Sequence, residues 1–159
     1  FLGRTSLFYV ETLADIALYS VMCAFAVILT SASLVWGIAI LRHTKTGLGS
    51  LLGLSLIATF VTTCVVAGYL SGQTGHFIGT PVTGEIVPFL GWSREVGDLR
   101  PAHFFATHLM HVVPAAGLLV AGSAARITQR QAILLTGIGT LATFAIFAQA
   151  LLGLPLFPA

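Results

Sequence analysis

Four long apolar stretches decide which folds this chain can adopt. A helix needs about 20 mostly apolar residues to cross the hydrocarbon core of a bilayer. In this chain of 159 residues, the stretches that meet this requirement lie at about residues 16–41, 50–70, 101–121 and 131–152. We therefore predict an all-α fold, an integral membrane four-helix bundle in which residues 1–159 form a single transmembrane domain.

The composition excludes several functions. Hydrophobic residues make up 57% of the chain and charged residues only 8%, against about 25% charged in an ordinary soluble domain. The net charge of +2 forms no basic stripe, so we expect no nucleic-acid partner. There is no P-loop, dinucleotide fingerprint, HExxH motif or nucleophile elbow, and we expect no catalytic residues. Cys23 and Cys64 lie in apolar runs without CxxC spacing, which predicts free thiols with a packing role.

The connections predict which helices are neighbours. Residues 42–49 and 122–130 are short enough to join antiparallel helices. Residues 71–100, between the second and third helices, form a long loop whose aromatic and apolar content favours packing at the membrane interface. The apolar spacing over residues 2–13 predicts an interfacial amphipathic helix before the first span.

Orientation follows from the distribution of Lys and Arg. The two short loops carry Arg42, Lys45, Arg126 and Arg130 and no acid, whereas the opposite side carries Arg4, Arg94 and Arg100 together with all five acids. Cytoplasmic loops are enriched in Lys and Arg. We therefore predict that the short loops are cytoplasmic and that both termini and residues 71–100 face outward.

The segment GWSREVGDLRPAHFFATHLMHVVP, residues 91–114, contains most of the chemically informative side chains. Trp92 suits the aromatic belt at the outer interface. Asp98 fits the N-cap of the third helix, with Pro101 tolerated in its first turn. Arg100 is expected to pair with Asp98 or with a lipid headgroup. Gln149, in the fourth helix, is expected in the same outer half of the bilayer.

Three histidines follow in the third helix. Counted from Pro101, His103 lies in the first turn, His108 about 10 Å down and His111 about 15 Å down, all within one arc of the helix. Ionisable residues at such depth usually face the bundle interior and serve function. Three interpretations remain open: hydrogen bonds to Thr62, Thr63 or Gln149 on other helices, a bound haem or metal ion, and a quinone or proton-relay site.

A haem with two histidine ligands needs them on opposite sides of its plane, so one helix cannot supply both. His43 lies at the opposite end of the bundle, whereas His76 follows the second helix and could fold back toward His103. The candidate ligands of a haem b or of a metal ion, whose identity stays open, are therefore His103, His108 and His76.

The same segment, together with the closing QALLGLPL of residues 149–156, resembles a group of small four-helix bacterial inner-membrane proteins. The group shows a W-S…G-D-L-R…H-F…H…P pattern. The match covers the third and fourth helices and the loop before them. His111 stands where glutamine is more usual, which favours His103 and His108 as ligands. The resemblance implies a multi-pass protein of the bacterial inner membrane, with its outward face in the periplasm, and no particular activity.

Three functions remain as hypotheses. The first is a small subunit of a larger membrane complex, respiratory or photosynthetic, with a structural or accessory role and other membrane proteins as partners. The second is a redox protein that holds haem or a metal at the outer-side histidines. The third is a small transporter or proton relay, which is disfavoured because the spans contain no carboxylate apart from Asp15 at the margin of the first.

Overall fold

The computed structural model describes residues 12–159. It contains four helices that are each long and apolar enough to cross a membrane: α1 (Leu13–His43), α2 (Gly47–Ser71), α3 (Leu99–Ala121) and α4 (Gln129–Leu151). Each helix begins and ends within three residues of the predicted bounds. The predicted interfacial helix over residues 2–13 falls almost entirely outside the described residues.

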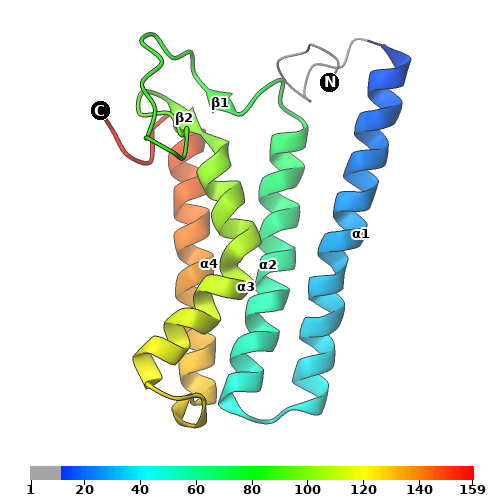
Figure 1. The fold of residues 1–159 in the computed structure, drawn as a ribbon, viewed down its shortest axis with the longest axis vertical. Helices are drawn as coiled ribbons and strands as arrows, with labels where there is room; N and C mark the ends of the chain where they lie inside the picture. The colour runs from blue at the N-terminus through cyan, green and yellow to red at the C-terminus, as the bar shows by residue number, and fades with distance from the viewer. Residues whose placement is uncertain (1–11) are drawn as a thin grey trace.

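The helices stand side by side, and consecutive helices run in opposite directions (Figure 1). One end of the bundle carries the α1–α2 turn and the α3–α4 connection, which includes the 3-10 helix η1 (Ala124–Arg126). The other end carries the α2–α3 connection and the C-terminus (Figure 1). Helix α2 packs against all three other helices, whereas the main partner of α1 is α2 alone.

Polar side chains at the helix starts explain where the helices begin. A residue with an extended backbone precedes each helix, and its side-chain oxygen accepts a hydrogen bond from the first turn; these residues are Thr12, Thr46, Asp98 and Thr128. Helix α3 ends at Gly122, which adopts φ 68°, a left-handed conformation that glycine adopts without a steric penalty. Caps satisfy backbone groups that the bilayer cannot hydrate.

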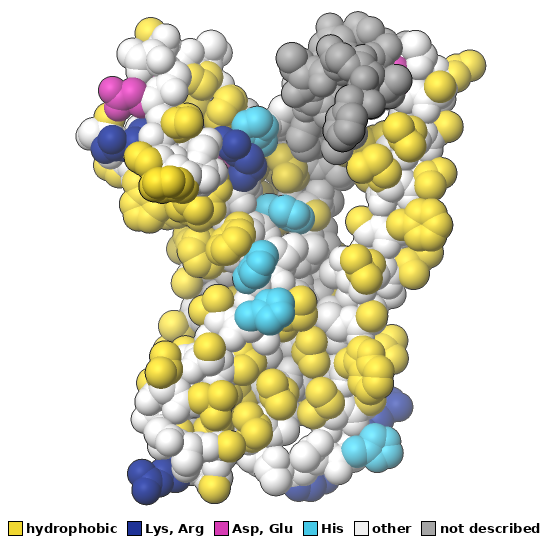
Figure 2. Space-filling model, in the orientation of Figure 1, with side chains coloured by type: hydrophobic (Ala, Val, Ile, Leu, Met, Phe, Trp, Pro, Cys, Tyr) yellow, Lys and Arg dark blue, Asp and Glu magenta, His cyan; other side chains and the backbone are white. Residues whose placement is uncertain are grey.

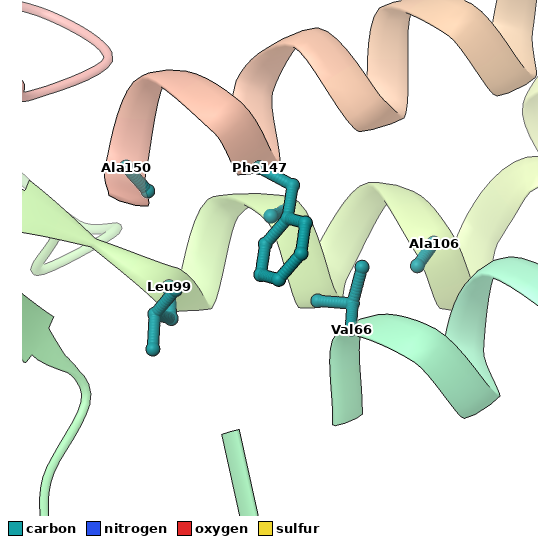
Figure 3. Close-up of a cluster of buried hydrophobic side chains, with 6 residues drawn as sticks. Val66, Leu99, Ala106, Phe147 and Ala150 are labelled. Carbon is teal, nitrogen blue, oxygen red and sulfur yellow. The ribbon is translucent and has the colours of Figure 1, made fainter. Parts of the chain in front are cut away.

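The core lies among α2, α3 and α4. One cluster, shown in Figure 3, consists of Val66, Leu99, Ala102, Ala106, Phe147 and Ala150. A second cluster, toward the short-loop end, consists of Leu51, Leu109, Val113, Ile127 and Ala132. Small residues in both clusters let the helix backbones approach closely, as is common in membrane bundles.

Helix α1 differs from the other three. Its 31 residues extend about 46 Å, against a hydrocarbon core of about 30 Å, and an overlong helix tilts to fit. Gly37 is its one buried residue, and it lies against Gly53 and Ile57 of α2. From this crossing, α1 inclines away from the bundle toward its N-terminal end (Figure 1).

The connection between α2 and α3 contains a feature that the sequence patterns did not predict. Strands β1 (Phe77–Ile78) and β2 (Gly97–Asp98) pair antiparallel, and Ile86 and Ser93 form a further bridge. The Glu95 carboxylate accepts hydrogen bonds from the backbone N–H groups of Val82, Thr83 and Glu85. These contacts give the connection a defined structure and hold it over the start of α3.

Candidate functional site

The start of α3 is built around a buried carboxylate. Asp98 is 2% exposed, and it accepts hydrogen bonds from the backbone N–H groups of Arg100, at 3.0 Å, and Ser93, at 2.9 Å. The Arg100 guanidinium pairs with the same carboxylate at 2.7 Å. Arg100 also donates to the carbonyl oxygen of Gly91 and lies over the ring of Phe77. The ion pair therefore joins strand β2, which contains Asp98, to the start of α3, which contains Arg100.

Trp92 and Gln149 take part in local packing near the same end. Trp92 is 8% exposed, and its ring lies 5.9 Å from that of Phe104 and 6.5 Å from that of Phe105, measured between centroids. Gln149 donates its side-chain N–H to the carbonyl oxygen of Pro155 at 2.6 Å. The Gln149 amide therefore secures the turn after α4.

His76 lies beside the start of α3. Its carbonyl oxygen accepts a hydrogen bond from the Leu99 N–H, and its ring packs on Phe77 at 4.1 Å. Burial lowers the pKa of the His76 imidazole, the Arg100 charge lowers it further, and the Asp98 charge partly opposes both. The net effect favours the neutral form of the His76 imidazole. Within residues 12–159, no hydrogen bond or ring contact joins His76 to His103.

His103 lies about 6 Å along α3 from Leu99, counting helical rise. Its Nδ1 atom is buried and has no hydrogen-bond partner in the described part of the chain. The side chain lines a cavity of about 410 Å³ between α1, α2 and α3, together with Thr63 and Thr107. Both cysteines, Cys23 and Cys64, are free thiols on the wall of this cavity.

His108 and His111 follow along the same side of α3. The His108 Nδ1 lies 2.7 Å from the carbonyl oxygen of Phe104, and its ring stacks on the Phe104 ring at 4.2 Å. His111 is exposed, and its ring centroid lies 5.7 Å from that of His108. Figure 2 shows histidine side chains following one another down this face, where α1 separates from the rest of the bundle.

The interhelical hydrogen bonds that we considered for the three histidines do not form among residues 12–159. Thr62 donates to the carbonyl oxygens of Ala58 and Ala106, and the Thr63 hydroxyl has no partner. The Gln149 side-chain amide donates its hydrogen bond to the carbonyl oxygen of Pro155. The histidines are therefore not used to join helices through these residues.

The described residues also contain no group of three or more His, Cys, Asp or Glu side chains that could hold a metal ion. His103 and His108 come from adjacent turns of one helix, and His76 lies at its start. Residues 12–159 therefore do not assemble a site with three or more such ligands. A group that needs one histidine from this chain is compatible with the geometry.

Sequence reasoning named Thr63 only as a possible hydrogen-bond partner of the histidines, and it missed the cavity that Thr63 lines. A signal was present, because Thr59, Thr62 and Thr63 place three hydroxyls on consecutive turns of an apolar helix. Such hydroxyls commonly donate to backbone carbonyl oxygens of the preceding turn, so a threonine in an apolar helix does not by itself predict a binding site. Which of them stays unbonded depends on rotamer and on neighbouring helices, and the sequence pattern does not specify either.

Comparison with protein-family models, with curated proteins and with solved structures found no match to this chain. We therefore infer its function from the residues and their geometry.

Proposed function

We propose that this chain is a small integral membrane subunit of a larger bacterial membrane complex, respiratory or photosynthetic, with a structural or accessory role. The observation that carries the proposal is the position of His108 and His111. Their side chains lie near mid-depth of a membrane-spanning helix, on a surface that the bundle itself does not cover.

The depth follows from helix geometry. His111 is the thirteenth of 23 residues in α3, so it lies about 18 Å along a helix of about 35 Å. Ionisable side chains at that depth are expensive to expose to lipid and usually meet protein or a water-filled cavity. Within the described residues, the His111 side chain makes no hydrogen bond, and its one ring contact is with His108. A partner protein at this face would supply the missing contacts.

The proposal places the chain in a bacterial inner membrane with its short loops in the cytoplasm. Arg42, Lys45, Arg126 and Arg130 at that end support this orientation, as the positive-inside rule requires. Both termini and the α2–α3 connection then lie in the periplasm. In this orientation, the Asp98–Arg100 ion pair and Trp92 would lie at the periplasmic interface, where aromatic and charged side chains commonly anchor a span.

A site-specific photo-cross-linker tests the proposal. A benzoylphenylalanine is placed at position 111 of the full chain, expressed in its native membrane, and illuminated before solubilisation. The matched control places it at Ile138, an exposed position of 62% on α4. We expect adducts with one membrane protein at position 111 and lipid adducts alone at position 138. In a mild detergent, the chain should migrate within the same complex.

Two results would overturn the proposal. Lipid adducts alone at both positions, with migration as a monomer, would show that no partner covers the histidine face. Adducts between two copies of this chain alone would show self-association in place of membership in a larger assembly.

A specific observation at His108 favours a second function, a haem-binding or metal-binding redox protein. A carbonyl oxygen can only accept, so the short contact with Phe104 assigns the proton of neutral His108 to Nδ1. The Nε2 lone pair is then free, and this is the tautomer that a ligating histidine needs. His103 and His76 are the other candidate ligands of this chain, and a partner subunit would have to complete the coordination.

Absorption spectroscopy distinguishes this second function. Protein purified with its partners would show a Soret band, or bound metal by elemental analysis, that is lost in His108→Gln. His111→Gln should retain the signal, because His111 shows no contact that would fix its tautomer. The absence of a chromophore and of bound metal in the wild-type complex would exclude the redox function and leave the subunit proposal intact.

A further inference from the structure

A groove opens between α1 and the other helices. Two contacts between α1 and α2 flank the groove: the close crossing of Gly37 and Gly53, and a hydrogen bond of 3.0 Å from the Tyr19 hydroxyl to the Ser71 carbonyl oxygen. Between these contacts the two helices separate, and α3 forms the floor of the opening. Figure 2 shows the hollow on the face that bears the histidines.

Two adjoining chambers make up the groove. The upper chamber has a volume of about 410 Å³ and the lower one about 460 Å³. They share Leu29, Thr30, Thr63 and Thr107 as lining residues, so the groove is continuous. His103 lines the upper chamber and Trp36 the lower one. None of the lining residues is Lys, Arg, Asp or Glu.

Two polar atoms of residues that line the groove are buried and lack partners in the described part of the chain. Thr63 is 6% exposed, and its Oγ1 makes no hydrogen bond. Its neighbours on α2 behave differently, because Thr59 and Thr62 donate to backbone carbonyl oxygens one turn earlier. The buried His103 Nδ1 is the second unpartnered atom. A buried polar group without a partner is expensive, so a ligand in the groove that hydrogen-bonds to Thr63 and His103 would remove that cost.

We propose that the groove binds a quinone or quinol, with the head group hydrogen-bonded to His103 and Thr63 and the isoprenoid tail along the lower chamber. The head group is neutral and carries oxygens that accept or donate hydrogen bonds, which matches two polar atoms in a groove without charged side chains. A phosphate head group would find no cation there. The apolar lower chamber and the membrane-facing opening suit a long hydrocarbon tail.

The residues that would hold the quinone, His103 and Thr63, are distinct from His111, where we propose that a partner protein packs. The proposal therefore stands without the subunit function, and the purified chain alone is enough to test it. The lower chamber contains its own reporter, because quinones quench tryptophan fluorescence and Trp36 is one of two tryptophans. A Trp92→Phe background leaves Trp36 as the only emitter.

The experiment titrates decylubiquinone into the full chain in quinone-free phosphatidylcholine nanodiscs and follows Trp36 emission. We expect saturable quenching in the Trp92→Phe protein. Thr63→Val, which removes the hydroxyl at constant shape, should weaken the apparent affinity by about tenfold, as expected for a lost buried hydrogen bond. Thr136→Val is the matched control, because the Thr136 hydroxyl is also buried and unpartnered but lies on α4, away from the lining of the groove.

A groove-filling variant provides an independent arm. Gly68 lines the upper chamber, and a Cβ built there meets no atom within 4 Å, so Gly68→Leu fills the groove without a clash at Cβ. It should abolish saturable quenching while leaving the size-exclusion profile unchanged. Non-saturable quenching that is equal in the Trp92→Phe protein, Thr63→Val and Gly68→Leu would overturn the proposal. Saturable binding of oleate, with none of decylubiquinone, would also overturn it and identify a fatty acid as the occupant.

Discussion

Gly37 of α1 lies against the backbone of Gly53 in α2, so closely that a Cβ built on Gly37 would meet the Gly53 carbonyl oxygen at 2.8 Å. The same Cβ would lie 2.8 Å from Cγ1 of Ile57. A backbone atom cannot move aside as a flexible side chain can. This contact therefore fixes where α1 crosses α2, and the divergence of the two helices above it opens the groove.

Gly37→Ala should separate α1 from α2. We expect the free energy of unfolding in mixed micelles to fall by about 1–3 kcal/mol, the usual range for overpacking a tight contact. Gly137→Ala is the control, because a Cβ at Gly137 meets nothing within 4 Å and alanine is the better helix former. Equal stability of both variants would show that the crossing tolerates a wider helix separation.

Cysteine labelling checks the orientation. Single cysteines at Ser123 and Thr80 are placed in a background in which Cys23 and Cys64 are replaced by alanine. Neither the Ser123 nor the Thr80 side chain makes a hydrogen bond within residues 12–159, so the fold should tolerate both changes. In intact spheroplasts, an impermeant maleimide should label position 80 at once and position 123 only after permeabilisation. The reverse pattern would invert the predicted topology.

Much of this fold could be predicted from local sequence patterns. Long apolar runs specify spanning helices because the bilayer leaves the backbone few alternatives. Helix starts were readable because cap chemistry is local: Asp98 lies directly before Leu99, the first residue of α3. The short ribbon of β1 and β2 was not predicted. Its two-residue strands show no periodicity, and the Glu95 contacts that organise the connection come from residues 10 to 13 positions earlier.

The candidate site was predictable only in part. Helical spacing correctly places His103, His108 and His111 along one side of α3. It does not show what that side faces, because the tilt of α1 is set by its contact with α2 at Gly37 and by its excess length. Trp36 therefore became a site residue, and Thr63 a lining residue of the groove, only when the groove was visible. No periodicity in the sequence relates them, because they lie on different helices.

Glu95 should make the stability of the α2–α3 connection depend on pH. The hydrogen bonds from Thr83, Val82 and Glu85 lower the pKa of the Glu95 carboxyl from 4.5 to about 2. Since the folded-state pKa is the lower one, the stabilisation is fully present above pH 4.5 and is lost as the pH falls toward 2. Amide hydrogen-exchange protection at Val82 and Thr83 should decline over this window.

The Glu95→Gln variant should lack this decline, because the amide does not titrate. Glu85→Gln is the matched control, since Glu85 contributes only its backbone N–H to the cluster. It should retain the wild-type pH dependence. Protection that stays constant between pH 4.5 and pH 2 in the wild type would contradict the assignment of these hydrogen bonds to the ionised carboxylate.

Asp98 should be the most sensitive position at the end of the bundle that carries the α2–α3 connection. Its carboxylate caps α3, accepts from Ser93 and pairs with Arg100. Asp98→Ala removes all three interactions. We expect a loss on the order of 2–4 kcal/mol in the free energy of unfolding, below the sum of a cap and a fully buried ion pair because Arg100 is 36% exposed.

Two further variants separate the roles of Asp98. Asn is an equally good cap, so Asp98→Asn should recover the helix start while leaving Arg100 without its counter-ion. Its amide can offer an oxygen to only one of the two N–H donors, and we therefore expect an intermediate stability. Arg94→Gln is the control, because within the described residues the Arg94 side chain donates to the carbonyl oxygen of Pro158 at an exposed site. This change should lower the free energy of unfolding by less than about 0.5 kcal/mol. If Asp98→Ala unfolds at the same denaturant concentration as Arg94→Gln, the buried carboxylate does not stabilise the start of α3.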